Sequence, residues 1–298
     1  MRIATNTIAT AIVRQLQQLN SSQARLQSQV ATGQRITQPE DDPVAVGRVL
    51  TLAAQQRQIT QYSANADRAL QVSQASFAGL TGFKQVSDRT SEIASLSNGA
   101  QGASGLGAYA AELNQLIEQG LQTANSRLGN EYLFGGTAVD SAPFTATRDA
   151  SGNITGVTYA GNTAQASIPL SETAAVTPGT TGDTNAALAD LLNNIISLRD
   201  ALAAGNTTPV NALQTAMGAG EDKLIAGLSD QGGVQLRIEV NQADQTSRSQ
   251  NITSLISSET DADLPTTIVH LNQVQTAYQA ALQSSAYIMK LSLLDYIN

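Results

Sequence analysis

Apolar residues recur every three or four positions along most of the chain, which is the spacing of amphipathic helices. Near the N-terminus this pattern predicts a helix from about Asn6 to Thr32. Its apolar positions alternate at intervals of four and three residues, the heptad spacing of a coiled coil. They are Ile12, Leu16, Leu19, Leu26 and Val30, with Gln23 at the intervening position. Leu264-Pro265 begins a last helix with the same spacing, and its predicted seam is Ile268, Leu271, Gln275, Tyr278, Leu282, Ser285 and Met289.

Local signals indicate where the helices between these two begin and end. Gly33 suits the end of the first helix, and a polar connector follows from Gln34 to Glu40. The motif Asp41-Asp42-Pro43 then restarts a helix, because Asp42 can cap free backbone amides and proline suits the first helical position. This second helix is predicted to bury one broad apolar stripe. The stripe comprises Val46, Leu50, Ile59, Leu70, Phe77, Leu80, Phe83, Val86, Ile93 and Leu96.

Glycine-rich segments divide the middle of the chain. Four glycines between Asn98 and Gly107 break the second helix, and a third helix follows with apolar positions from Leu106 to Leu128. The segment from Gly129 to Asp183 is rich in Gly, Thr, Ser and Val, which predicts short strands and turns. Asp149 to Asn153 is predicted as a hairpin turn between two of these strands. Two further helices are predicted at about 185–204 and 208–258, where Gly232-Gly233 could introduce a kink.

The pattern as a whole predicts a mainly α fold with a small β insertion. A lone helix of the kind predicted at each end is marginal in water and needs a partner helix. The ends also carry few charges: the N-terminal segment has arginines but no acid before Glu40, and after Asp263 the chain has only Lys290 and Asp295. Two interpretations stay open, an antiparallel pair within one chain or surfaces that pack against other copies. The β segment is either an exposed recognition module or a segment without a recognition role.

Composition argues against most binding and catalytic chemistry. The net charge is −8, charged residues make up 13% and aromatic residues 4%, which disfavours a nucleic-acid partner. Cysteine is absent and His270 is the sole histidine, so no metal site, cofactor site or Ser-His-Asp triad is expected. The acidic clusters at Glu40 to Asp42 and at Asp261 and Asp263 precede helix-opening prolines, which favours helix capping over calcium binding. We therefore expect a protein that is not an enzyme.

No apolar run has the length of a membrane span or of a signal-peptide core. Ile8 to Val13 is too short for either and is closed by Arg14. The sequence therefore predicts no membrane-spanning helix, and a protein that leaves the cell without a cleaved signal peptide if it leaves at all.

Several motifs resemble those of the flagellin superfamily, and within it those of the hook–filament junction branch. At the N-terminal end they are residues 1–6 (MRIATN), 31–36 (ATGQRI) and 41–45 (DDPVA); at the C-terminal end they are 275–282 (QTAYQAAL) and 291–296 (LSLLDY). Residues 132–136 (YLFGG) with Pro143-Phe144 resemble the passage from the helical core into the family's variable domain. Filament flagellins typically carry Ala-Ala-Gly in place of Pro43-Val44-Ala45 and end in a Leu-Leu-Arg-like motif.

The resemblance implies an elongated layered rod of long antiparallel helices. Residues 1–40 with 260–298 would pair as a terminal coiled-coil layer, 41–130 with 185–259 would form the helical rod, and 131–184 would form an outer β-rich variable domain. It also implies an extracellular protein of the bacterial flagellum, exported unfolded by the flagellar type III apparatus. Its implied partners are other copies in a ring, a neighbouring hook-associated junction protein, flagellin, and a cytoplasmic export chaperone bound to the C-terminal helix.

The function predicted from these observations is that of a structural adaptor ring between hook and filament, on which flagellin assembles. The predicted subunit-packing residues are Ile12, Leu16, Leu19, Leu26, Val30, Ile268, Leu271, Tyr278, Leu282, Met289, Leu291 and Leu294. Two alternatives stay open. One is a filament flagellin, which differs in partners and copy number, and the other is a monomeric binding module that displays the β segment.

Overall fold

The computed structural model describes residues 2–98 and 102–297, and among them the side chains of 10–98, 102 and 104–287. The described chain is mainly helical with small antiparallel strand pairs, which confirms the predicted fold class at this level. The helices are α1 (Arg2–Thr32), α2 (Pro43–Ser97), α3 (Ala103–Ala124), α4 (Gly182–Ala203), α5 (Val210–Thr260) and α6 (Leu264–Ile297). The strands are β1 (Arg127–Leu128), β2 (Glu131–Tyr132), β3 (Phe144–Arg148), β4 (Ile154–Tyr159), β5 (Ile168–Pro169) and β6 (Ala175–Val176).

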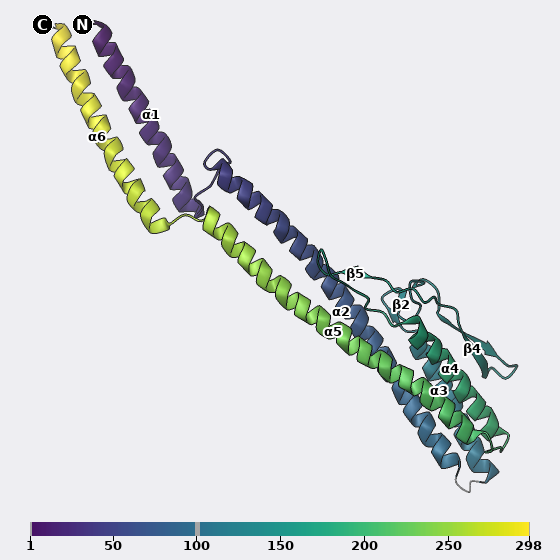
Figure 1. The fold of residues 1–298 in the computed structure, drawn as a ribbon. Coiled ribbons are helices and arrows are strands. Elements are labelled where there is room, and N and C mark those ends of the chain that lie inside the picture. Colours follow the sequence, from purple (N-terminus) through teal and green to yellow (C-terminus); the bar gives the residue numbers. More distant parts are fainter. Residues whose placement is uncertain (1, 99–101, 298) are drawn as a thin grey trace. The chain divides into compact units, whose positions relative to one another are not determined.

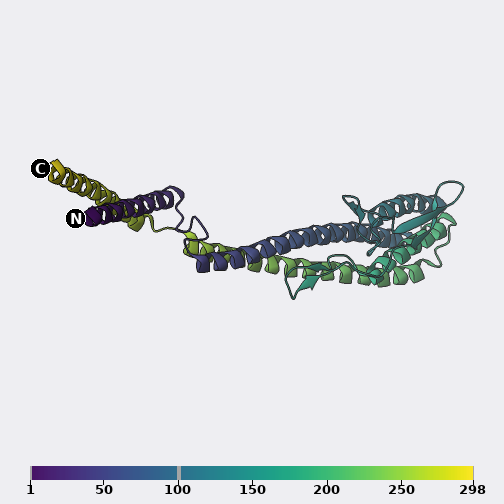
Figure 2. The ribbon, with the colours of Figure 1, turned by 90° about the horizontal axis from the view of Figure 1, so that it is seen from above.

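The chain forms two compact units. Unit 1 comprises residues 1–58 and 248–298, and unit 2 comprises residues 59–247. In unit 1, α1 and α6 contact each other along their length and lie side by side in two perpendicular views (Figure 1, Figure 2). The connectors that join these helices to α2 and α5 also belong to unit 1. They pair through a short antiparallel bridge between Gln34 and Asp261.

Unit 2 has its own hydrophobic core. The core is built where α3 and α4 pack against each other and against the portions of α2 and α5 that belong to this unit. Its largest fully buried side chains include Leu80, Phe83, Ile117, Leu192 and Ile195. The backbone of α3 at Gly120 lies close to the Leu192 side chain of α4, because a Cβ added at Gly120 would lie 2.8 Å from the Cδ2 atom of Leu192. Unit 2 therefore contains the apolar burial that a folded domain needs.

Two details of the helices differ from the sequence predictions. The third helix ends at Ala124 rather than near Leu128, because the Asn125 side chain bonds the backbone of Phe144 and Leu128 continues in β1. In α2 the predicted apolar positions Leu50, Phe77 and Leu96 are exposed. Other members of the predicted stripe are buried as expected, including Leu80, Phe83 and Ile93. The buried face of α2 also carries small residues, which are Ala66, Ala69, Ser73, Ser76 and Ser87.

Three antiparallel strand pairs lie in and next to the β segment, and the first is the short pair β1–β2. β3 and β4 pair antiparallel, and the turn between them spans residues 149–153, which confirms the predicted hairpin. β5 and β6 form a shorter hairpin that packs on α2 and α5 through Leu170 and Val176. Side-chain amides hold this shorter hairpin: Asn65 donates to the carbonyl of Pro169 at 2.9 Å and Gln245 to the carbonyl of Leu170 at 3.1 Å. The predicted strand-rich composition therefore corresponds to three short antiparallel pairs, and β3–β4 and β5–β6 are fastened to helices.

The motif at residues 132–136 has a packing role at the start of the β segment. Phe134 is fully buried, and a Cβ added at Gly79 of α2 would lie 2.7 Å from the Cζ atom of its ring. Gly136 adopts a φ of +69°, and a Cβ there would meet backbone oxygens of Asn162 and Ala164 at 2.8 Å or less. A residue with a side chain fits neither glycine position without rearrangement.

Candidate assembly surfaces

The predicted packing residues of α1 lie at regularly spaced, half-buried positions. Ile12, Leu16, Leu19, Leu26 and Val30 are all half-buried, whereas the residues adjacent to Ile12, Leu16 and Leu19 are exposed. This pattern agrees with one face of α1 packing against α6.

On α6, the half-buried and buried face differs in part from the predicted seam. Leu271, Gln275, Tyr278 and Ser285 lie on it, but Ile268 and Leu282 are each 44% exposed. Their expected places are taken by Thr267, Val274 and Ala281, which with Leu271, Tyr278 and Ser285 form an unbroken four–three repeat. The face of α6 that is shielded from solvent is therefore shifted by about one residue from the predicted seam, and its side chains are smaller than those predicted. Met289, Leu291 and Leu294 lie outside the residues whose side chains are described.

The pair formed by α1 and α6 buries little apolar volume. Among residues 10–32 and 264–287, only Thr267 and Ser285 are buried, and both are small and polar. Large apolar side chains are instead exposed, including Val269 at 54% and Tyr287 at 67%. Apolar groups left in water in this way lose the free energy that their burial would supply. The described part of this helix pair thus has an incomplete core.

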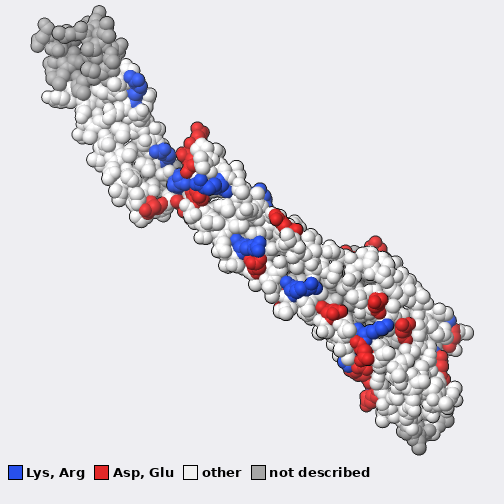
Figure 3. Space-filling view, viewed as in Figure 1, with Lys and Arg blue, Asp and Glu red and all other residues white. Residues whose placement is uncertain are grey.

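These terminal helices are also nearly free of charge. From Leu264 to Met289 the sequence contains no Asp, Glu, Lys or Arg, and the described side chains of α1 include only Arg14 and Arg25 as charged residues. The part of this region that Figure 3 describes is accordingly white apart from a few blue side chains, whereas charged side chains are frequent elsewhere. An uncharged surface can be buried against a neighbour without stripping water from ions.

Ionic contacts hold the two connectors of unit 1 together. α2 begins at Pro43, and the Asp42 carboxylate accepts a hydrogen bond from the amide of Ala45 at 3.0 Å. Arg35 donates to the Asp42 carboxylate at 3.1 Å and to the carbonyl of Glu259 at 2.8 Å. Arg48 forms a bidentate pair with the Glu259 carboxylate, with both nitrogen–oxygen distances at 2.8 Å. We call these four residues, Arg35, Asp42, Arg48 and Glu259, the connector clasp.

The clasp and the preceding turn lower the pKa values of their carboxyl groups. The hydrogen bond from Arg48 lowers the pKa of Glu259, and the bond from the Ala45 amide is the largest cause of the lowered pKa of Asp42. The pKa of Asp41 is lowered chiefly by the backbone amides of Gln38 and Thr37. Each contact therefore favours the ionised form, so its contribution to stability is complete above the ordinary pKa values of 3.8 and 4.5. It is lost as the pH falls through the lower folded-state values.

Replacing Glu259 by Gln should loosen the connectors at neutral pH, because it removes one charge and one half of the bidentate pair with Arg48. We expect trypsin to cleave after Arg35 a few-fold faster in the Glu259→Gln variant than in the parent protein. Gel electrophoresis or mass spectrometry of timed digests would measure this rate. Glu239→Gln, at an exposed position of α5, is the matched control and should digest at the parent rate; equal rates for all three proteins would contradict the role of the clasp.

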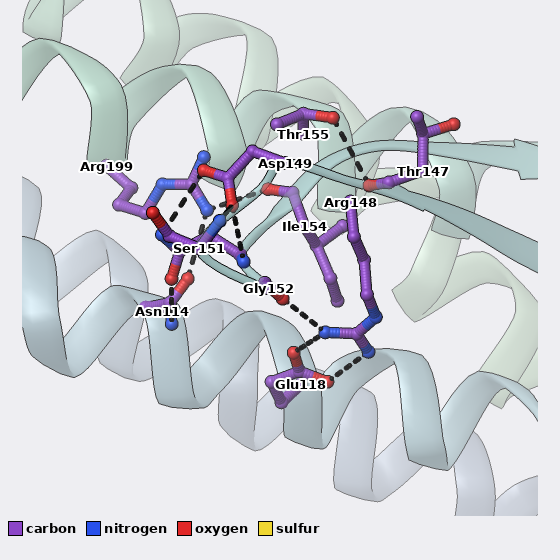
Figure 4. Close-up of polar contacts among 11 residues, drawn as sticks. Asn114, Glu118, Thr147, Arg148, Asp149, Ser151, Gly152, Ile154, Thr155 and Arg199 are labelled. Atoms are coloured by element: carbon purple, nitrogen blue, oxygen red, sulfur yellow. Dashed lines mark hydrogen bonds and ion pairs between the residues drawn. The ribbon is translucent and has the colours of Figure 1, made fainter.

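A separate polar cluster fixes the β3–β4 hairpin on α3 and α4 (Figure 4). Arg148 of β3 forms a bidentate ion pair with Glu118 of α3 and donates to the carbonyl of Gly152 at 2.8 Å. Arg199 of α4 is only 8% exposed, and it donates to the carbonyl of Ile154 at 2.7 Å and to the Asn114 side chain at 3.0 Å. We call this cluster, with the two asparagines described next, the hairpin anchor.

Two asparagine side chains each form a pair of hydrogen bonds with the backbone of one strand residue, as a neighbouring strand would. Asn193 of α4 accepts from the amide of Val157 and donates to its carbonyl, both at 2.9 Å. Asn125 makes the same pair of contacts with Phe144, at 3.0 and 2.9 Å. Each amide satisfies one donor and one acceptor at a strand edge, so these groups are not left for pairing with another chain. The sequence does not reveal these contacts, because an isolated asparagine gives no signal of a distant strand.

Arg199→Met should destabilise unit 2, because it leaves the buried carbonyl of Ile154 and the Asn114 side-chain oxygen without their donor. The expected loss is about 1–3 kcal/mol of unfolding free energy, measurable by urea denaturation followed by circular dichroism. Arg148→Met is the matched control, since its ion pair with Glu118 is largely solvated and its loss should cost less. A larger loss from Arg148→Met than from Arg199→Met would contradict the assignment of the anchor.

Neither a metal-binding cluster nor a membrane-spanning helix is found among the described residues. In the residues whose placement is described, no group of three or more His, Cys, Asp and Glu side chains could hold a metal ion. None of the helices in the same part of the chain combines the length and apolarity needed to cross a bilayer. His270 lies exposed on α6, and Gly135-Gly136 forms a turn, as its lack of phosphate-loop spacing predicts.

Comparison with known proteins shows what this chain is similar to. Residues 3–138 match the family model of the bacterial flagellin N-terminal helical region. The flagellar hook-associated protein 3 of Escherichia coli (strain K12) is 24% identical over 98% of both chains. A solved Vibrio parahaemolyticus protein described as a flagellar hook-associated protein superposes with a TM-score of 0.66 at 16% identity, covering 74% of this chain and all of that one. Bacillus cereus FlgL gives a TM-score of 0.59 at 16% identity, covering 71% of this chain and all of that one. The chain is therefore similar to the bacterial flagellin N-terminal helical region over residues 3–138, and it resembles hook-associated protein 3 along nearly its whole length.

Proposed function

We propose that the protein forms an adaptor ring between the flagellar hook and the filament, and that flagellin assembles on this ring. The observation that carries the proposal is the incomplete core of the α1–α6 pair, whose described part exposes Val269 and Tyr287 on a surface without charges. Such a surface is stabilised when neighbouring copies cover it. The similarity to hook-associated protein 3 supports the hook–filament junction as the place where this occurs.

The proposed packing residues are those predicted from the heptads of the two terminal helices. Two members of the set, Ile268 and Leu282, are exposed in the single chain and so are available to another copy. Others, such as Leu16 and Tyr278, are half-buried and would become fully buried when further helices surround the pair. The hook-side face would contact a neighbouring hook-associated protein, and the opposite face would contact flagellin.

The proposed route to this position is export through the flagellar type III apparatus without cleavage of a signal peptide. An exposed apolar helix such as α6 would self-associate in the cytoplasm. A cytoplasmic chaperone that covers α6 before export would prevent this. The exposed residues Ile268, Val269 and Leu282 are the proposed elements of its binding surface.

The test is electron microscopy of a strain that lacks the protein, combined with measurement of flagellin in the culture medium. The proposal expects hooks without filaments and flagellin shed into the medium, both reversed by a plasmid copy of the gene. Quantitative mass spectrometry of purified flagella separates the ring from a filament flagellin, because a ring requires far fewer copies than a filament. Normal filaments in the deletion strain, or a copy number equal to that of the filament subunit, would overturn the proposal.

A further inference from the structure

Helix α5 exposes a row of apolar side chains on the side that faces away from its buried contacts. Ile225, Leu236 and Val240 are 46%, 62% and 63% exposed. The buried positions Leu224, Gln231, Val234 and Ile238 lie roughly on the opposite side of the helix at 100° per residue. Ser229, Gly232 and Gly233 fall on the exposed side with the apolar residues. We call this row, Ile225, Ser229, Gly232, Gly233, Leu236 and Val240, the α5 stripe.

The glycine pair at the centre of the α5 stripe is not explained by packing within the chain. Glycine weakens a helix interior more than any residue except proline. A Cβ added at Gly232 or Gly233 would meet no atom within 4 Å, so nothing in the described chain excludes a side chain there. Glycines at such a position allow the backbone of another helix to approach closely.

The order of residues in the α5 stripe is symmetric about this glycine pair. The successive intervals from Ile225 to Val240 are four, three, one, three and four residues, which read the same in both directions. A two-fold axis at the Gly232–Gly233 bond would place Ile225 opposite the partner's Val240 and Leu236 opposite the partner's Ser229. Self-complementarity of this kind is what a two-fold interface between identical chains requires.

Charged residues along one edge of the α5 stripe fit the same arrangement. Lys223, Asp230, Arg237 and Asp244 are exposed, follow each other at seven-residue intervals and alternate in sign. In an antiparallel pair this edge meets its own copy, so Arg237 approaches the partner's Asp230 and Lys223 approaches the partner's Asp244. A parallel pair would bring the edge against Glu221 and Glu239, so Asp230 and Asp244 would face no opposite charge there. The antiparallel arrangement therefore matches more opposite charges.

We propose that the α5 stripe is the docking surface for a second copy of this chain, which packs against it in antiparallel orientation with the two helices crossing at Gly232-Gly233. The contact involves few side chains, and interfaces much smaller than about 1,200 Å² are weak and transient. The pair therefore forms at high protein concentration and covers the α5 stripe while the protein is free in solution. This inference does not depend on the proposed role at the hook–filament junction.

Cysteine cross-linking tests the pairing directly, because the chain contains no cysteine of its own. Ile225→Cys and Val240→Cys variants are purified separately, mixed at high concentration and oxidised. The proposal expects a mixed disulfide dimer of the two variants and little self-dimer of either, since two copies of Ile225 would lie about 22 Å apart along the crossing. Gly233→Cys should cross-link with itself, because the two-fold axis passes beside it.

The controls distinguish this pairing from random collision. Ala111→Cys, at an exposed position of α3, should stay monomeric under the same oxidation. Adding Leu236→Glu to the Gly233→Cys variant should reduce its cross-linking several-fold, because it places a carboxylate in the apolar contact. Self-dimers of Ile225→Cys and Val240→Cys without the mixed dimer would overturn the antiparallel arrangement, and yields no higher than those of Ala111→Cys would overturn the docking surface. Neither result would affect the junction role, which is tested by filament growth in the deletion strain.

Discussion

Removing residues 264–298 should abolish filament growth while leaving unit 2 folded. The deletion removes α6 and its uncharged outer face, but every residue of the unit 2 core lies between 59 and 247. Helix α1 then lacks the helix that it contacts, and a lone helix of this composition is marginal in water. We therefore expect circular dichroism to show the loss of both α1 and α6, 31 and 34 residues of helix, rather than of α6 alone.

The experiment expresses the truncated and the full-length protein from the same plasmid in the deletion strain. Full-length protein should restore filaments, and the truncated protein should restore none even when immunoblotting shows equal amounts in the cell. Thermal unfolding of the purified truncated protein serves as the folding control, and its cooperative transition should remain. Filament growth supported by the truncated protein would contradict the account.

Placing negative charges on the outer face of α6 should also block assembly without destabilising the single chain. Val269 and Tyr287 are largely exposed, so Val269→Glu and Tyr287→Glu bury no charge in the isolated protein and should change its unfolding free energy by no more than about 0.5 kcal/mol. In an assembly that covers these positions, each carboxylate would be buried without a cation in the described part of α6, which is strongly unfavourable. We expect the double variant to swim poorly or not at all and to carry few filaments.

Gln250→Glu is the matched control, because it adds the same charge at an exposed helical position of α5. Soft-agar motility and filament counts should be close to those of the parent for this control. Normal motility of the Val269→Glu, Tyr287→Glu variant, with its thermal unfolding unchanged, would contradict burial of this face in the organelle.

Much of the helical framework follows from local signals in the sequence. The spacing of Ile12, Leu16 and Leu19 identifies the half-buried face of α1, because the large apolar residues of this part of the helix lie on a single face. The start of α2 follows from the capping capacity of Asp42 and the fixed φ of Pro43. The β3–β4 turn follows from a polar segment between alternating strands, with Gly152 at a φ of +89°.

The remaining features depend on contacts between distant residues. The sequence could not decide which row of α6 faces α1. Thr267, Val274 and Ala281 repeat with the same period as the row of Ile268 and Leu282, and only the position of α1 decides between the two rows. The buried Arg199 and the paired contacts of Asn125 and Asn193 involve strands up to 45 residues away. Composition could not reveal them, because polar residues on a helix are ordinarily solvated.

Amide hydrogen exchange of α1 and α6 tests most directly the claim that other molecules complete the core of the terminal helices. The exchange rates would be compared between dilute purified protein and protein within isolated flagella, with the amides of α4 as the internal reference because that helix is buried in unit 2. The account predicts rapid exchange in α1 and α6 of the dilute protein and slow exchange in flagella, with α4 slow in both. Equal, strong protection of α1 and α6 in both samples would contradict it.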